Sequence, residues 1–595
     1  MKLTPSENIS AIAVLPFTNR SSNAENEYFC DGITEEIIIA LAKIERLKVI
    51  SRTSSFFFKN QSYSLQEVAD KLQVPYLIAG SVRLNGKALR ISTELIEIAG
   101  DETIWSNSWD RELKNVFEIQ DEISLEIADQ LRERIGHLTF EDHLIEQRTH
   151  NLSAYEHYLK GKYHSNQWNP EDIRLAIDHF EKAIQLDDQL IEGHLGISDA
   201  YSFMAVAGFA PREEAWQKSI TALALAKKLD PDHAGLNYML GMKSFFTEAD
   251  FAAALQYGLK SLAAKPTYSE AHQFVSFLHS LKGDFDTARK HILFAKSADP
   301  LNPETKFYEA NYNYRLGEYD KAKAILSELL ELNDKNLPAI IVQIYILIGE
   351  GQLKAARQSI EAVPQQALTP DERLGLLALI DAMEGKSTTH LQRLEQQAQE
   401  AEAHHAHAYL FLCYANLGRY QEAFAVLENL FNSSSSILLL SFSDPLGKPI
   451  HSHPSYPQYH ERIYPKTIEK PILKKRKQAD PTLTKEQVEK IHAYVESERP
   501  YLNPSLTLRS LAEELAIHPN QLSRLLNESI GKNFNDFINK KRIEHFQQIV
   551  MDPDNSHISL IGLAYESGFN SKSVFNSAFK KEVGMTPKAF QKSQG

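Results

Sequence analysis

The same pattern occurs twice near the C-terminal end of the chain, first in LAEELAIHPNQLSRLLNESIG (Leu511–Gly531) and again in LAYESGFNSKSVFNSAFKKEVG (Leu563–Gly584). Each stretch begins with Leu-Ala. In each stretch, a short segment with apolar residues on one face meets a tight turn, and a second amphipathic segment follows. Pro519 suits the first turn of a helix. The pattern predicts two helix-turn-helix units in tandem.

The second helix of each predicted unit combines an apolar stripe with a polar face. The stripe packs on the core of its unit, so the polar face is left for a partner. In the major groove of DNA, Arg and Lys can bond the O6 and N7 atoms of guanine, and Asn and Gln can bond the N6 and N7 atoms of adenine. The predicted DNA-contacting residues are Asn520, Gln521, Ser523 and Arg524 in the first unit, and Lys572, Ser573, Asn576 and Ser577 in the second.

A long helix over about Asn533–Met551 is expected to join the two units and to fix their separation. If that helix is rigid, both reading helices can enter successive major grooves, roughly 34 Å apart on one face of the duplex. A single chain would then read DNA as a dimer of one-unit proteins does.

Over about Thr484–Gln591 the sequence resembles the AraC/XylS transcriptional regulators. The motif that carries the resemblance runs from Ile558 through Gly568-Phe-Asn-Ser to Gly584-Met-Thr-Pro587. The resemblance implies an all-α DNA-binding domain over 482–595, with double-stranded promoter DNA as its partner. The chain departs from the family pattern at several positions, which leaves the operator sequence open: Val574 stands for an aromatic residue, Ser577 for Arg, and Leu526-Asn527 for Phe-Lys.

Charge separates the two ends of the chain. Of its 64 Lys and Arg and 78 Asp and Glu, the region 466–595 holds 20 basic and 15 acidic side chains, and the region 1–465 holds the other 44 and 63. Basic side chains gain affinity for DNA by releasing counterions from phosphates, and acidic ones repel it. A weakly basic reader joined to an acidic body is therefore expected.

The middle of the chain has a 34-residue period. Phe251, Phe285, Tyr319 and Leu353 keep this spacing, and an Ala lies at the same short distance after each of them. The period is typical of tetratricopeptide repeats, helix pairs that stack and share a continuous core. Seven or eight units are predicted over 151–440, an all-α solenoid with a concave groove. The groove would bind a peptide or protein, or the array would be a spacer without a ligand.

The region 1–136 alternates strands and helices and predicts a separate α/β domain. Its strings Ile12-Ala-Val-Leu-Pro-Phe17 and Tyr28-Phe-Cys-Asp-Gly32 resemble the TolB-like (FlgO-type) domain, and the resemblance supplies no catalytic residue. Arg52, at a strand end, could hold an anion, although ordinary turn chemistry is the simpler interpretation. The fold class is therefore multidomain, α plus α/β.

The remaining features favour a binding protein over an enzyme. The region 441–481 contains seven prolines and a Lys-Lys-Arg-Lys run, which predicts a Pro-rich basic linker. Two cysteines, Cys30 and Cys413, lie far apart, so neither a disulfide framework nor a metal site is indicated, and no cofactor is expected. No apolar run is long enough to cross a bilayer, which predicts a cytoplasmic protein without membrane contact.

These features lead to one main hypothesis, a bacterial transcription regulator that reads promoter DNA sequence-specifically. Its N-terminal and repeat regions would sense a small molecule or a protein partner. The alternative is a repeat-based signalling scaffold in which DNA binding is weak or secondary. An enzyme is not expected, because no recognisable catalytic set is present. The effector, the choice between activation and repression, and a homodimer are left open.

Overall fold

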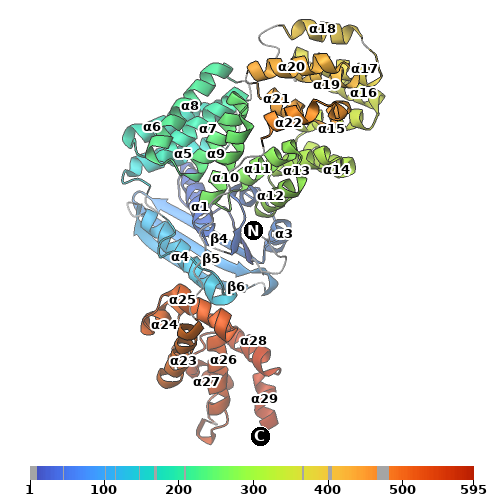
Figure 1. The fold of residues 1–595 in the computed structure, drawn as a ribbon. Helices are drawn as coiled ribbons and strands as arrows, with labels where there is room; N and C mark the ends of the chain where they lie inside the picture. The colour runs from blue at the N-terminus through green and yellow to red at the C-terminus, as the bar shows by residue number, and fades with distance from the viewer. Residues whose placement is uncertain are drawn as a thin grey trace. The chain divides into compact units, whose positions relative to one another are not determined.

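The structure is a computed structural model, shown as a ribbon in Figure 1. The described residues are 10–44, 46–100, 102–113, 116–145, 148–166, 170–206, 209–364, 368–386, 388–399, 405–433, 435–465, 481–555 and 557–594. They divide into two compact units. One contains the N-terminal α/β domain and the C-terminal helical domain, and the other contains the segment 50–62 with the helical repeats.

The α/β domain is built on one mixed sheet with the strand order β3-β1-β4-β5-β6. β1 runs parallel to both β3 and β4, while β4, β5 and β6 form an antiparallel meander. Gly86-Lys87 forms the tight turn between β4 and β5, where Asn85 pairs with Ala88 and Gly86 has φ +59°. The strands are β1 (Ser10–Val14), β2 (Thr18–Asn19), β3 (Leu47–Val49), β4 (Tyr76–Asn85), β5 (Ala88–Glu97) and β6 (Glu102–Glu112).

Helices complete this domain and position its outer surface. α1 (Glu27–Leu41) packs against β1 and against α4 (Val116–Ile135), and α3 (Leu65–Leu72) packs against β4. The buried side of α4 carries Ile119, Ile123, Ile127 and Leu131 at helical spacing. Gly136, directly after the end of α4, takes φ +70°, a conformation that favours glycine.

The central region consists of helix pairs, as the 34-residue period predicts. Eight pairs lie in the described part of 152–432, and Gly283, Gly317, Gly351, Gly385 and Gly418 each adopt positive φ near a turn within a pair. The pairs are α5 (Leu152–Ser165) with α6 (Pro170–Leu186), α7 (Ile191–Val206) with α8 (Arg212–Leu229), α9 (Ala234–Glu248) with α10 (Phe251–Ala264), α11 (Ser269–Lys282) with α12 (Phe285–Ala298), α13 (Pro303–Leu316) with α14 (Tyr319–Leu332), α15 (Leu337–Gly349) with α16 (Leu353–Ala362), α17 (Pro370–Met383) with α18 (Thr389–Gln397), and α19 (Ala406–Asn416) with α20 (Tyr420–Asn432).

The 34-residue spacing also places equivalent residues in equivalent environments. Ala254, Ala288, Ala322 and Ala356 are all fully buried where the helices of a pair approach each other. A small side chain at each of these positions lets the two helices pack closely. The 34-residue period of the sequence therefore corresponds to equivalent buried positions in successive helix pairs.

The first part of the predicted linker is folded, which corrects the expected boundary at position 441. α21 (Ile437–Ser441), a 3₁₀ segment (Pro445–Ser452) and α22 (Tyr456–Ile463) pack back onto the repeats. Phe442, Leu446 and Ile450 are buried, and Tyr314 donates a hydrogen bond to Asp444 at 2.8 Å. The prolines shape a bent apolar segment here. The region 466–480, with the basic run, lies outside the described residues.

Tyr464 anchors this returning segment. Its ring packs edge-on against Phe251 with ring centres 4.8 Å apart, and its hydroxyl donates to the Leu439 carbonyl at 2.7 Å. Phe251 begins α10 and Leu439 lies in α21, so Tyr464 joins the two ends of a long stretch of the repeats. The inner side chains of this part of the array are therefore covered by the chain's own segment.

The C-terminal domain has two small apolar cores, one for each helix-turn-helix unit. Leu511, Leu522 and Leu526 lie in the first core, and Leu563, Phe575 and Phe579 lie in the second. The helices are α23 (Pro481–Glu498), α24 (Leu508–Glu514), α25 (Pro519–Arg524), a wider π-type continuation (Leu525–Ile530), α26 (Phe534–Ile549), α27 (Leu560–Glu566), α28 (Lys572–Val583) and α29 (Pro587–Gln594).

Two contacts tie the units of this domain together. Arg542 of the connecting helix α26 is buried and donates to the Tyr501 carbonyl at 2.8 Å and to the Asn503 carbonyl at 2.9 Å. Gly568, in the turn of the second unit, has φ +91°, and a Cβ there would lie 2.1 Å from the Tyr501 oxygen. The second turn therefore requires glycine because it packs directly on the backbone of the first unit.

Replacing Tyr464 with Ala should release the returning segment. The variant loses a fully buried aromatic side chain, which costs about 3–5 kcal/mol of unfolding free energy, whereas Tyr464→Phe loses only the hydroxyl contacts with the Leu439 carbonyl and Ser443, about 1 kcal/mol each. Hydrogen exchange over 437–465 measures the effect. Equal exchange in the Ala and Phe variants would show that the ring does not hold the segment.

Candidate nucleic-acid interface

The second helix-turn-helix unit presents its predicted reading face openly. Ser571 precedes α28, and all four predicted residues of that helix, Lys572, Ser573, Asn576 and Ser577, are exposed. On the opposite side of α28, Phe575 and Phe579 are buried in the core of the unit. The apolar stripe thus fixes the rotation of the helix, and the polar face is left accessible.

A shallow depression beside this face adds two residues that the sequence analysis did not select. Thr586 and Lys588, around the start of α29, line it together with Lys572 and Asn576. Lys588 brings a second cationic side chain close to the reading helix, where it can contact a phosphate. Its position at the start of a helix that follows Gly584 was the available sequence signal.

The first unit is only partly accessible. Arg524 is exposed and Gln521 is half-buried, but Ser523 is only 1% exposed, so the prediction that Ser523 contacts DNA does not fit this structure. Asn527, one turn further along, donates to the Ser523 carbonyl at 2.7 Å. Ser523 stands between Asn520 and Asn527 on one face of the helix, and both neighbours lie against the α/β domain, Asn520 at Arg132 and Asn527 at Gly136.

Asn520 is held by the α/β domain. Its Oδ1 accepts a hydrogen bond from Arg132 Nη1 at 2.9 Å, and its Nδ2 donates to the Phe140 carbonyl at 2.8 Å. Arg132 comes from α4 and is itself 1% exposed, stacked over the Phe140 ring at 4.4 Å. Both ends of the Asn520 amide are therefore engaged within the protein.

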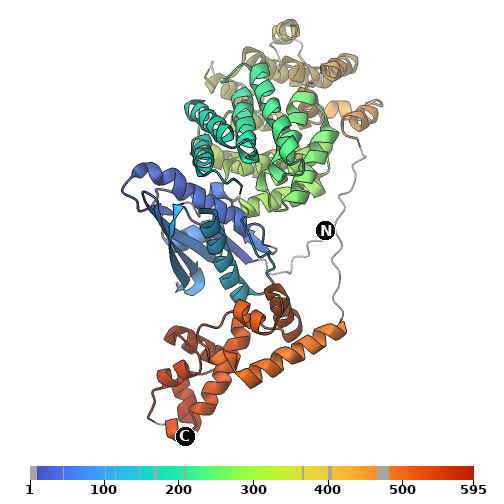
Figure 2. The same cartoon turned by 90° about the vertical axis from the view of Figure 1, so that its left-hand side faces the viewer.

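Further contacts surround Asn520 and join the same two domains. The Leu508 N–H, at the start of α24, donates to Glu133 Oε1 at 2.7 Å. Arg509 pairs with Asp129 at 3.1 Å, and Asn533 Nδ2 donates to the Arg134 carbonyl at 2.9 Å. α24 and α26 both pack against α4, and Figure 2 shows the α/β domain in blue meeting the C-terminal domain in orange. We call this surface the α4 interface.

Burial in the α4 interface perturbs Glu133. Loss of solvation raises the pKa of its carboxyl to about 7, against the opposing effects of the Leu508 N–H and of Arg132 and Arg134. The nearby Asp129 raises it further. Glu133 therefore changes its charge near neutral pH while it lies against the first helix-turn-helix unit.

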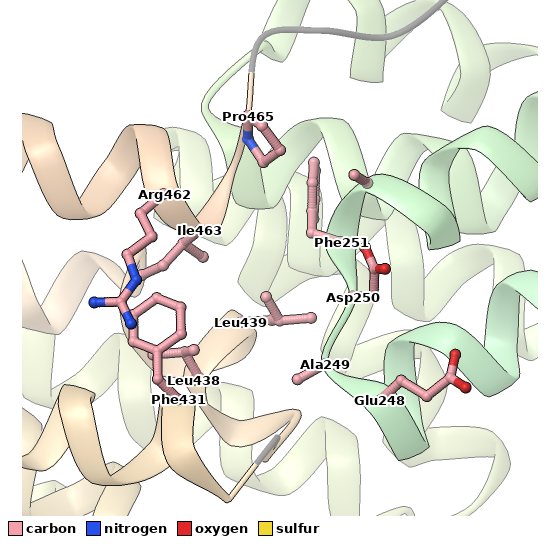
Figure 3. A pocket seen from close by; sticks show the side chains of 11 residues that line it. Glu248, Ala249, Asp250, Phe251, Phe431, Leu438, Leu439, Arg462, Ile463 and Pro465 are labelled. Atoms are coloured by element: carbon pink, nitrogen blue, oxygen red, sulfur yellow. The ribbon is translucent and has the colours of Figure 1, made fainter.

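The other candidate sites offer fewer groups that could bind a ligand. Arg52, which was expected at a strand end, begins the short helix α2 (Arg52–Phe56). In that helix Ser54 donates through its backbone N–H and its hydroxyl to Asp299, so a carboxylate already occupies the position expected for an anion. A second cavity lies beside the returning segment, with Phe431 and Arg462 on one side and Asp250 and Phe251 on the other (Figure 3). Its lining combines apolar and charged side chains, and its hydrogen-bond donors do not point toward one common position. In the described ranges, no group of three or more His, Cys, Asp or Glu is arranged to hold a metal ion.

Among the residues that the structure describes, no helix has both the length and the apolar content needed to cross a membrane.

Two family models match the chain. The region 511–593 matches a helix-turn-helix domain, and the region 8–126 matches the second domain of HilA/YgeH-like transcriptional regulators. The first match spans both predicted units, so the C-terminal domain is a helix-turn-helix DNA-binding domain of the AraC type. The TolB-like identity of the N-terminal domain stays a prediction.

Curated relatives match parts of the chain. A putative adenylate cyclase 3 of Rhizobium meliloti (strain 1021) is 32% identical over 189 residues, 32% of each protein. The melibiose operon regulatory protein of Escherichia coli (strain K12) is 30% identical over 88 residues, 15% of this chain and 28% of that protein. The chain thus spans about a third or less of the length of these relatives.

A solved tetratricopeptide repeat protein from Parabacteroides merdae is 12% identical and aligns over 44% of this chain and 99% of its own, with a TM-score of 0.31. That score is low, and the repeat architecture rests instead on the eight helix pairs and their 34-residue spacing.

Replacing Glu133 with Gln should alter the pH dependence of stability. A raised carboxyl pKa gives stability that is complete below the ordinary value near 4.5 and is lost as pH rises to about 7. Gln keeps the acceptor for Leu508 and removes the charge. At pH 8 the variant should be more stable by up to about 3 kcal/mol, with little difference at pH 4.5. Denaturant unfolding at both pH values measures this, and an equal difference at both would contradict it.

Proposed function

We propose that the chain is a bacterial transcription regulator that binds promoter DNA sequence-specifically through its C-terminal domain. The observation that carries the proposal is the reading face of α28, where Lys572, Asn576 and their neighbours project from a folded unit. These side chains have the hydrogen-bonding groups that distinguish base edges in the major groove. The regulator acts where promoter DNA lies, in the cytoplasm.

The N-terminal and repeat regions supply the sensing part of this proposal. Helix-repeat arrays present long surfaces to protein partners, and the second of the two matched families is also a regulator domain. Part of the array is covered by the segment 437–465, so a partner would bind elsewhere on it or displace this segment. A small-molecule effector and a homodimer are further proposals within the same function.

We assign no enzymatic activity to the chain. The putative adenylate cyclase of Rhizobium meliloti matches over 32% of each protein, and the expectation that this chain is not an enzyme stays a prediction. A scaffold whose main working surface is the repeat array is the second candidate, supported by the large share of the chain that forms helix pairs.

Selection from a random duplex pool by the purified full chain tests the proposal. At near-physiological salt, enrichment of a motif supports sequence-specific reading, and mutations on the repeat surface should then alter promoter activity through DNA occupancy. Absence of any enriched motif would favour the scaffold.

Lys572→Ala and Asn576→Ala should each weaken binding to the selected duplex by about 10- to 100-fold, or about 1–3 kcal/mol, and relax specificity at one base position. Lys592→Ala, which removes the same charge from exposed α29, is the matched control and should weaken all sequences slightly and equally. Competition binding with single-base variants of the duplex measures the effect. A uniform loss with Lys572→Ala would place that lysine on phosphate alone.

A further inference from the structure

We propose that the α4 interface is an autoinhibitory contact, in which the α/β domain covers the first DNA-reading helix and competes with DNA for it. The inference rests on the proposed function, because it concerns how the same C-terminal domain is regulated. It is carried by the contacts of Asn520, by the position of α25, and by the charges that α4 presents.

The Asn520 amide makes the competition direct. Reading adenine with Asn requires the amide oxygen and nitrogen together, on N6 and N7 of the base. Arg132 holds the oxygen and the Phe140 carbonyl holds the nitrogen, at 2.9 and 2.8 Å. Asn520 therefore cannot read a base until both of these bonds break.

Steric exclusion also indicates that the α/β domain and DNA compete for the first reading helix. In helix-turn-helix proteins, the N-terminal residues of the second helix reach the base edges, and Asn520 is the second residue of α25. The major groove is about 12 Å wide and admits one helix. With Arg132 and Phe140 against the start of α25, no duplex can bring its bases to the same place.

Charge complementarity explains why these two domains fit each other. Asp129, Glu133 and Asp142 of the α/β domain face Arg509, the Leu508 N–H and His518 of the first unit, and the His518–Asp142 distance is 3.4 Å. Cationic side chains and helix-start N–H groups are the usual partners of DNA phosphates. Carboxylates of α4 and of the segment after it thus take the partners that phosphates would otherwise engage.

The second unit is left open by this arrangement. All four predicted residues of α28 are exposed, whereas in the first unit Asn520 is engaged and Ser523 is buried. A chain with the α4 interface closed can read one sub-site, and release of the interface adds the other. A ligand or partner that binds the α/β domain better in its released form would shift the chain toward two-site reading.

A reversible covalent lock tests the inference in the full chain. A Cβ at Gly136 would lie 2.6 Å from the side-chain Cγ of Asn527, so a disulfide between Gly136→Cys and Asn527→Cys can span this contact, with the cysteine at position 136 held at the positive φ of the native glycine. Neither residue belongs to the predicted reading face. The native Cys30 and Cys413 are buried, which limits competing oxidation.

The oxidised double variant should form the 136–527 disulfide, bind the selected two-site duplex at least tenfold more weakly than the same protein after reduction, and select only one sub-site. Each single variant should be unaffected by oxidation. Failure of the disulfide to form while both thiols react with a maleimide would overturn the inference. Equal DNA affinity of the oxidised and reduced forms would overturn it as well.

A second pair of variants keeps the test independent of cysteine chemistry. Asp129→Asn with Asp142→Asn removes two charges from the α4 interface and should raise DNA affinity several-fold more than the matched control. The control, Glu118→Gln with Glu122→Gln, removes two charges from α4 away from the interface. Equal gains would mean general repulsion of DNA by acidic groups, against the inference.

If no form binds any duplex, the proposed function has failed and the competition fails with it. The disulfide yield then reports only that the two domains are in contact.

Discussion

A side-chain amide has one acceptor end and one donor end, and at Asn520 both are taken by the α/β domain. The accessibility of the first reading helix depends on this constraint. Arg132 can reach Asn520 only because α4 buries the arginine beneath Phe140, and α4 lies there because its apolar side packs on α1 and the sheet. The state of the first reading helix thus depends on the packing of a domain at the opposite end of the sequence.

The two reading units share a plan but differ in environment. α26 joins them, and Arg542 and Gly568 fix the second unit against the backbone near Tyr501. Because that junction is packed and buried, the C-terminal domain is suited to act as one body. A contact that holds the first unit therefore also restricts the positions that the second unit can take on the same duplex.

The repeat array has a corresponding feature in its own unit. The segment 437–465 packs on the repeats, with Tyr464 against Phe251 and Asp444 beneath Tyr314. Apolar residues between the prolines make this possible, since Phe442, Leu446 and Ile450 supply a buried side that a tether would lack. Proline content alone predicted a linker, and it did not reveal that the segment had a core to join.

The sequence by itself determined the elements and the exposed polar face of α28. The 34-residue period, the alternation of strands and helices over 1–136 and the doubled helix-turn-helix pattern each arise from local spacing, so helices, strands and the face of α28 could be predicted. Only the tertiary structure decided the burial of Ser523, the engagement of Asn520 and the folding of the supposed linker. Those outcomes depend on contacts between residues far apart in the chain, such as Arg132 with Asn520 and Tyr314 with Asp444, and such contacts leave no periodic signal in the sequence.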